Sequence, residues 1–216
     1  MGHTARIWAA WWMVGWSLLA RAGEPTKDNP QVTVFVNDSA SAPERIVLAA
    51  EQNAGRVFHQ AGVEVEWMNC GAQDGNRSHT QCRDNMMSSG LVVRIIPHAR
   101  TLGDDIFGVS FVDHDSGTYA DLFFEPIEQL HQQNRDISLA PILGDVLAHE
   151  LGHLLLGSNA HSRDGIMQPH WTREQLRRVA MGQMRFSKEQ AARMRMRIAS
   201  SQIEHQNSPP LEASNR

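Results

Sequence analysis

The sequence predicts an α+β domain with its strands in the first part of the chain and its helices mainly in the second. Three observations support this prediction. Residues 31–38 (QVTVFVND) alternate valine with other residues at the period of a strand, residues 91–97 (LVVRIIP) are apolar on both faces, as in a central strand, and helical patterns dominate from Pro141 onward. With 216 residues, of which 41% are hydrophobic and 20% charged, the chain suits one domain with its own core.

The elements between these segments follow in a simple order. After the first strand, Pro43 opens a helical stretch that Gly62 ends, and a second strand is expected over residues 63–67. After the central strand, two more strands are expected within residues 106–124. Asp-Ser-Gly supplies the turn chemistry that would join them at residues 113–117.

The last part of the chain is expected to be helical. One helix begins with Pro141 and ends at Gly157, and a second is expected over residues 172–180. A third begins near Ser187, because Gln190 three positions later completes a capping-box pattern.

The two ends of the chain are expected to lie outside the folded domain. Arg6 is followed by an apolar run over residues 7–20 and by a small-x-small pattern that ends at Ala22, which is typical of a cleaved secretory signal. The run is shorter than the roughly 20 residues that cross a bilayer, so no stable membrane insertion is expected after cleavage. The protein would then be secreted or periplasmic. We expect a signal peptide over residues 1–22 and a flexible leader over residues 23–30. A single domain is expected over residues 31–201, followed by a disordered tail over residues 202–216.

The charge balance argues against one class of partner. The chain carries 20 basic and 24 acidic residues, a net charge of −4, and loss of the signal segment would remove two arginines and no acid. Nucleic acid is therefore not an expected partner.

The two cysteines, Cys70 and Cys82, bracket a polar loop. In an exported protein such a pair is expected to form a disulfide, which would stabilise the fold by roughly 3 kcal/mol. A small metal site formed by both thiols and His79 is the alternative, although no fourth ligand stands nearby.

Residues 148–167, AHELGHLLLGSNAHSRDGIM, carry side chains suited to metal chemistry. His149 and His153 are four residues apart, so on a helix both can reach a single ion. Glu150, one step round the helix, would stand beside that ion and could take a proton from water. The alternative is a core helix with hydrogen-bonded histidines, but such polar groups are costly to bury among Leu, Ala, Val and Gly without a partner. The stretch therefore predicts a zinc site with a catalytic base.

A catalytic zinc site needs a third protein ligand and one open coordination position. Gly157 ends the helix and permits positive φ, so the chain can turn back toward the ion. His161 is the nearest histidine after this turn and is the expected third ligand. The competing ligands are Glu174, His170 and Asp164.

The order of these residues resembles that of the metzincin zinc metallopeptidases. HELGH followed by a helix-ending glycine, a histidine and a methionine is the basis of the resemblance, and HELGHLLLGSNAHSRDGIMQP is most similar to the matrixin type. The motif similarity covers residues 143–169. Gly157 and His161 stand four and eight residues beyond His153, where metzincins have three and six, so a longer last turn and loop are expected.

The resemblance implies a fold and a set of roles. The fold would be zincin-like, with a mixed twisted sheet, a backing helix, an active-site helix and a small helical C-terminal subdomain. The metal ligands would be His149, His153 and His161, and the general base would be Glu150. Met167 would be the methionine of the turn beneath the metal. The expected function is that of an exported zinc-dependent endopeptidase, a hydrolase that binds Zn²⁺ and an extended polypeptide.

Two other functions stay open at this point. The metal could only stabilise a binding or scaffold protein that has no catalytic activity. The protein could also hydrolyse a non-peptide amide. Deformylase-like enzymes share the HExxH pattern, but they use an upstream cysteine as a ligand, and Cys70 and Cys82 stand in a different setting.

A few further residues have two interpretations each. The strand before the active-site helix, within residues 106–112 or 118–124, is either a substrate-binding edge or a plain core strand. Tyr119 and His170 either stabilise an oxyanion or serve packing and the surface. Asp145, one turn before His149, either orients that histidine or is an ordinary acid near a helix N-terminus.

Overall fold

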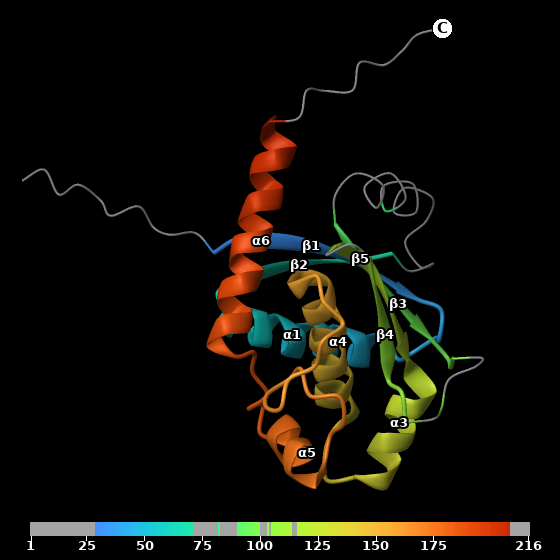
Figure 1. Ribbon diagram of the computed structural model, residues 1–216. Coiled ribbons are helices and arrows are strands. Elements are labelled where there is room, and N and C mark those ends of the chain that lie inside the picture. Colours follow the sequence, from blue (N-terminus) through green and yellow to red (C-terminus); the bar gives the residue numbers. More distant parts are fainter. Residues whose placement is uncertain are drawn as a thin grey trace, which may run out of the picture.

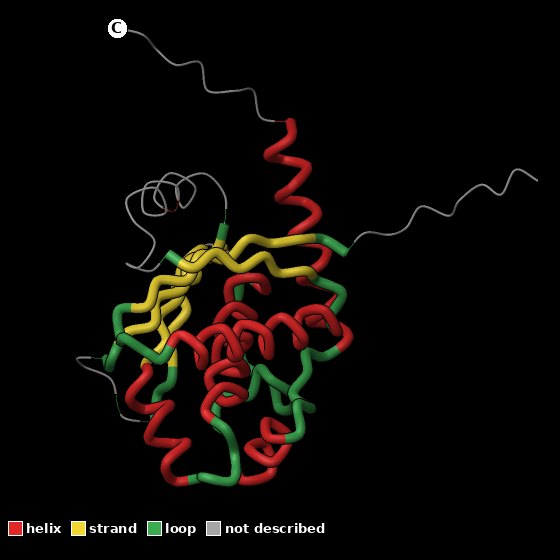
Figure 2. The backbone as a smooth tube through the Cα atoms, turned by 180° about the vertical axis from the view of Figure 1, so that it is seen from behind, coloured by secondary structure: helices red, strands yellow, loops and turns green. Residues whose placement is uncertain are grey.

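The computed structural model describes residues 29–70, 82, 90–99, 103, 105–113 and 116–207. The elements in chain order are β1 (Gln31–Asp38), α1 (Glu44–Gln60), β2 (Glu64–Asn69), β3 (Leu91–Ile96), β4 (Gly108–Asp113), β5 (Ser116–Phe123), α3 (Phe124–Gln133), α4 (Leu139–Leu156), α5 (Arg173–Ala180) and α6 (Lys188–Asn207). The strands form one sheet in the order β2-β1-β3-β5-β4, and helices α1 and α4 lie on the same face of it (Figure 1, Figure 2). The expected α+β fold with a mixed sheet is confirmed.

The parallel part of the sheet follows the predicted strand patterns. Val34 and Val36 of β1 are buried in the main core, whereas Phe35 belongs to a separate cluster with the cysteines. Strand β1 pairs in parallel with β2 and β3, and β3 pairs in parallel with β5. The strand over residues 91–97 was predicted to be central, and β3 lies in the middle of the sheet.

The predicted pair of strands within residues 106–124 is present as β4 and β5, which run antiparallel. Residues 114–115 of the expected turn lie outside the described residues. The sheet order places β4 at an edge and β5 between two neighbours. Of the two candidate edge strands, β4 is therefore the one that can accept a further strand.

Helix α1 backs the sheet as predicted. It begins after Pro43 and ends before Gly62, which has φ 73°. Its apolar side packs on α4 so closely that a Cβ atom on Gly144 would lie 2.6 Å from the carbonyl oxygen of Ala50. Glycine is needed at this crossing because no side chain fits between the two helices.

Helix α4 is the central core helix. By length and composition it could cross a membrane, but 83% of it is buried inside the protein. It ends as predicted at Gly157, which is in the left-handed conformation with φ 60° and ψ 41°. It begins at Leu139, before Pro141. The helix was predicted to start two residues too late, because proline is tolerated anywhere in the first turn, where backbone N–H groups have no intrahelical partner.

Helix α3 was not predicted. The expected strand through Phe124 stops at Phe123, and α3 begins directly after it. The aromatic run Leu-Phe-Phe favoured a strand, whereas Pro126 in the first turn and buried Ile127 were the helical signals. The N–H of Glu125 donates to the carbonyl of Pro97 at 2.9 Å, so the first turn of α3 is tied to the end of β3.

The two C-terminal helices begin where the sequence predicts them. The N–H of Ser187 donates to Gln190 Oε1 at 2.8 Å, and the N–H of Gln190 donates to Ser187 Oγ at 3.2 Å, which confirms the capping box. Helix α6 continues to Asn207, through the first part of the segment that was expected to be a disordered tail. One reason is that Gln202 donates a hydrogen bond of 2.9 Å to the carbonyl of Gln31 and so ties the helix to β1.

The predicted disulfide between Cys70 and Cys82 is present, and it packs with Phe35. The loop between the cysteines, residues 71–81, lies outside the described residues. The same is true of the expected signal peptide, of residues 23–28 in the leader and of residues 208–216 in the tail.

Candidate metal centre

Three histidines meet at the C-terminal half of α4. His149 and His153 lie on one face of this helix, and the chain turns back after Gly157 to bring His161 beside them. Ring centroids are 4.8 Å apart for His149 and His153, 5.3 Å for His149 and His161, and 4.9 Å for His153 and His161. Their ligand atoms all lie within 4.8 Å of one another. Within the described residues, no other group of acids, histidines and cysteines gathers in this way.

Backbone carbonyls orient the two helical histidines. His149 Nδ1 lies 2.7 Å from the carbonyl oxygen of Ile166, and His153 Nδ1 lies 2.8 Å from that of Ser158. A carbonyl oxygen only accepts, so each Nδ1 carries the proton and each Nε2 keeps a free lone pair. This arrangement, with a backbone acceptor behind the ring, is typical of histidines that bind a metal through Nε2.

The two Nε2 atoms face each other at 3.1 Å. A hydrogen bond between them would need an extra proton on one ring, but burial lowers the pKa of His149 to about 4 and lowers that of His153 as well. Two lone pairs at this distance repel unless a cation lies between them. Two nitrogen ligands of a tetrahedral zinc ion are about 3.3 Å apart when each Zn–N bond is about 2.0 to 2.1 Å. The donor set and its spacing therefore fit zinc.

Glu150 lies beside the histidines and is only 5% exposed. Ser110 Oγ is 2.6 Å from Glu150 Oε2 and 2.8 Å from the backbone oxygen of the same residue. Burial raises the pKa of Glu150 to about 7, although the hydrogen bond from Ser110 opposes the rise. A pKa near neutrality suits a group that must both accept and release a proton.

Strand β4 makes room for this carboxyl group. A Cβ atom on Gly108 would lie 2.7 Å from both Cγ and Oε1 of Glu150, so the carboxyl group fits there only because position 108 has no side chain. Gly108 and Ser110 were not singled out in the sequence. The signal that could have found them is weak, because glycine and serine also occur in many strands that contact no catalytic group.

Met167 is fully buried at the turn that follows His161. A Cβ atom on Gly152 would lie 2.6 Å from Met167 Sδ, so the sulfur packs on α4 at a residue between the two helical histidines. The carbonyl of Met167 also accepts a hydrogen bond of 2.8 Å from the N–H of Ser162, next to His161. The turn thus supports both the helix and the loop that carry the histidines.

The competing ligands lie in other surroundings. Glu174 is exposed on α5, where its carboxylate is 3.5 Å from Arg178 and 3.8 Å from Arg177. Asp164 is exposed, and its backbone oxygen accepts a hydrogen bond from Ser162. His170 lines the pocket but is not in the histidine group. The structure brings only His161 to the two helical histidines.

Two other residues considered from the sequence lie away from the centre. Tyr119 donates a hydrogen bond to Asp121, and its ring packs on Phe111 and beneath Arg94, outside the pocket. This supports a packing role and not an oxyanion role. Asp145 accepts a hydrogen bond of 2.7 Å from Asn53 on α1, so it does not orient His149.

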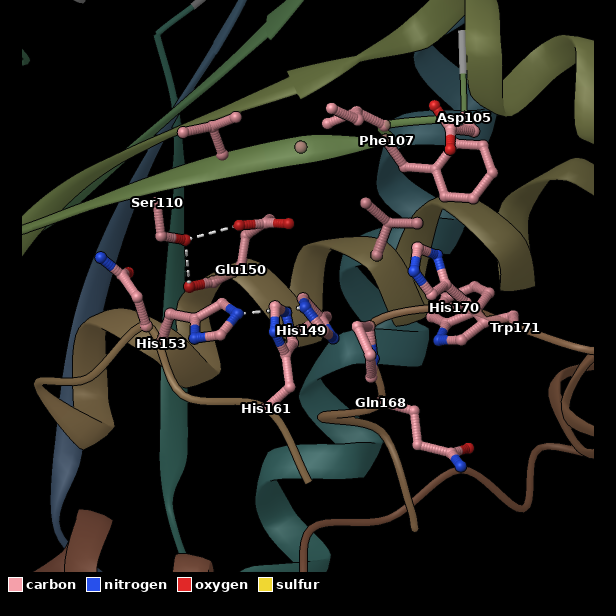
Figure 3. Close-up of a pocket in the computed structure, with 16 residues that line it drawn as sticks. Asp105, Phe107, Ser110, His149, Glu150, His153, His161, Gln168, His170 and Trp171 are labelled. Atoms are coloured by element: carbon pink, nitrogen blue, oxygen red, sulfur yellow. Dashed lines mark hydrogen bonds between the residues drawn. The ribbon is translucent and has the colours of Figure 1, made fainter. Parts of the chain in front are cut away.

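The site opens into a cavity of about 480 Å³. The three histidines, Glu150 and Ser110 line it together with side chains from the segment before β4 and from the segment after Met167 (Figure 3). From the first segment come Asp105, Ile106 and Phe107, and from the second come Gln168, Pro169, His170 and Trp171. The cavity can therefore hold a substrate against both the histidines and the edge strand.

Comparison with solved structures identifies the fold as zincin-like. Metalloproteinase-II from Bacteroides fragilis aligns with 80% of this chain and 55% of its own, at 13% sequence identity and a TM-score of 0.50. This chain therefore matches about half of the length of that protein. Archaemetzincin from Methanopyrus kandleri aligns with 81% of this chain and 98% of its own, at 15% identity and a TM-score of 0.42. No family model and no curated protein matches the sequence.

Proposed function

We propose that this zincin-like protein is a zinc-dependent endopeptidase whose ligands are His149, His153 and His161. The observation that supports the proposal most strongly is the pair of buried histidine rings whose Nε2 atoms face each other at 3.1 Å beside a buried acid. A zinc ion held there would supply Lewis acidity, which polarises a peptide carbonyl and makes water easier to deprotonate.

Glu150 is the proposed general base. Its carboxyl group is fixed between Ser110 and Gly108, and it lines the same cavity as the three histidines. It would take a proton from the attacking water and deliver it to the leaving amine. The hydrogen bond from Ser110 holds the carboxyl group in place for both transfers.

Strand β4 is the proposed binding surface for the polypeptide. It is the edge of the sheet beside Glu150, and an extended peptide could pair with it through backbone hydrogen bonds. The part of this strand nearest the cavity, from Gly108 to Phe111, carries no charged side chain that would oppose such pairing.

We also propose that the protein acts after export. The disulfide between Cys70 and Cys82 supports this location, because disulfides persist in oxidising compartments. The apolar segment over residues 7–20 is the second support, as a signal for secretion.

The first test uses Glu150→Gln. This change keeps the shape of the side chain and removes the base, so we expect peptide hydrolysis to fall by about 100-fold or more while one zinc ion remains bound. Metal analysis and cleavage of a peptide library measure the two quantities. If neither the native protein nor the variant cleaves any peptide although zinc is bound, the metal has a structural role and the proposal fails.

The second test concerns the third ligand. We expect His161→Ala to lose zinc, because it leaves only two nitrogen donors, and Glu174→Ala to retain it. The matched pair separates the two candidates, since among the described residues the ion pairs of Glu174 are with Arg177 and Arg178 on its own helix. Retention of zinc by His161→Ala together with its loss in Glu174→Ala would contradict the assignment.

A further inference from the structure

Two aromatic rings meet at one end of the catalytic cavity. Phe107 comes from the segment before β4 and Trp171 from the segment before α5, and both line the cavity. Their ring centroids are 6.4 Å apart at an interplanar angle of 40°, which is within the range of direct aromatic contact. In Figure 3 both lie at the same end as Asp105 and His170, away from Ser110. A peptide backbone cannot pass between rings in contact, so they form an end wall.

The backbone on each side of this end wall is anchored. The carbonyl of Phe107 accepts a hydrogen bond of 2.8 Å from the N–H of Phe123 on β5, so the sheet holds this residue. Trp171 directly precedes Thr172, whose N–H donates to the side chain of Gln175 at 3.1 Å and caps α5. Both rings also pack against the main core. The end wall is therefore part of the folded structure.

The catalytic acid and the end wall lie beside neighbouring residues of the chain that leads into β4. Gly108 contacts the carboxyl group of Glu150, and Phe107 is the preceding residue. An extended peptide paired with β4 advances about 3.3 Å per residue. It would therefore reach the end wall within about three residues of the bond beside Glu150.

Pairing direction decides which end of the peptide meets the end wall. Antiparallel pairing is slightly more stable than parallel pairing, and β4 already pairs in this way with β5. A peptide that runs antiparallel to β4 has its carboxyl end toward the start of the strand, where Phe107 lies. The opposite direction, toward Asp113, leads away from the end wall.

We propose that Phe107 and Trp171 limit the substrate to polypeptides that have only about three residues after the cleaved bond, so that cleavage occurs near a carboxyl terminus. The proposal rests on the zinc-peptidase function proposed above and narrows it from cleavage anywhere along a polypeptide to cleavage near a carboxyl terminus. The two aromatic residues act on chain length and take no part in the chemistry of bond cleavage.

The test compares cleavage positions produced by the zinc-loaded full-length protein and its variants on a library of peptides from a digested proteome. Mass spectrometry locates each cut relative to the two peptide ends. For the native protein we expect most cuts within about three residues of the carboxyl end. For Trp171→Ala and Phe107→Ala, we expect cuts to spread inward and kcat/KM to rise about tenfold on a peptide that is lengthened after the cleaved bond. A tenfold rise corresponds to removal of a steric clash of about 1.4 kcal/mol between the end wall and the longer peptide.

Trp67→Ala is the matched control. Trp67 is also a partly buried aromatic residue packed against the main core, but it lies on β2, at the opposite edge of the sheet from β4, and it does not line the cavity. We expect this variant to cut at the same positions as the native protein. The two aromatic variants test the end wall from opposite sides, so either one that remains folded by circular dichroism decides the outcome.

Three results would overturn the proposal. They are native cuts spread evenly along the peptides, native cuts gathered at the amino end, and a folded Trp171→Ala or Phe107→Ala variant with the native cleavage positions. Failure of the proposed function is distinguishable, because the native protein would then bind zinc and cleave no peptide at any position.

Discussion

Glu150 and Asp145 are two carboxyl groups on the same helix, little more than one turn apart, and burial raises the pKa of both to about 7. Glu150 is 5% exposed and Asp145 is 1% exposed. Their neighbours differ. Glu150 meets the hydroxyl of Ser110 at the edge of a cavity, whereas Asp145 meets the amide of Asn53 inside the packing of α4 on α1.

The comparison shows that burial alone does not identify a candidate catalytic acid. Asp145 Oδ2 has no hydrogen-bond partner among the described residues, so the charged form of this carboxyl group is poorly stabilised. It still has no route to a substrate, because α1 covers it. A raised pKa becomes useful for catalysis only where the group also lines a cavity that water and substrate can enter.

A glycine stands beside each carboxyl group, and the two glycines provide a matched pair of changes. Gly108→Ala is expected to have the largest effect on activity. Its Cβ atom would lie 2.7 Å from Glu150 Oε1, which is the far end of a flexible side chain, so the carboxyl group would move. Misplacement of a catalytic group by about 1 Å costs about 100-fold in rate. Peptide hydrolysis measures this loss, and zinc content should not change. Full activity of Gly108→Ala would show that Glu150 need not occupy this position.

Gly144→Ala is expected to have the opposite pattern. Its Cβ atom would meet the backbone oxygen of Ala50 at 2.6 Å and Asn53 Cβ at 2.7 Å, neither of which can move without separating α1 from α4. We expect the free energy of unfolding to fall by about 1 to 3 kcal/mol, as for other overpacked cores. Urea denaturation measures the change. Hydrolysis per folded, zinc-loaded molecule should stay at the native level. A selective loss of activity would contradict the inference that the side of α4 facing α1 serves stability and the side facing the cavity serves activity.

Asp145→Asn is expected to have the smallest effect on activity and to change the pH dependence of stability. Because the pKa of Asp145 is raised from 3.8 to about 7 in the folded protein, the folded state holds this proton more tightly than the unfolded state. Its contribution is fully present below about pH 4 and is lost as the pH rises toward and through 7. Asparagine does not titrate, so the native protein should lose stability relative to the variant between pH 4 and pH 8.

Urea denaturation of both proteins at several pH values, with a chelator present, measures this difference. The chelator removes the pH dependence of zinc binding, and all other titrating groups are shared. A difference in unfolding free energy that is the same at all these pH values would show that Asp145 is not protonated preferentially in the folded state.

Much of the fold was predictable because it depends on local signals. The period of residues 31–38, the apolar run at residues 91–97 and the glycine at position 157 each act over a few neighbouring residues, and each is confirmed. Helix α3 was not predicted because its first residues continue an aromatic strand pattern. Its first turn is tied to Pro97 by a hydrogen bond, and this contact is distant in the sequence.

For the candidate site, the sequence by itself determined the residues of the motif. The spacing of His149, Glu150 and His153 needs only helical geometry to place two imidazoles and an acid together. The tertiary structure decided which remote groups join them. His161 and not Glu174 reaches the histidines, and Gly108 and Ser110 arrive from an edge strand about 40 positions earlier in the chain. The reason is physical: periodicity specifies which side of an element a residue occupies, whereas contacts between elements depend on how the whole core packs.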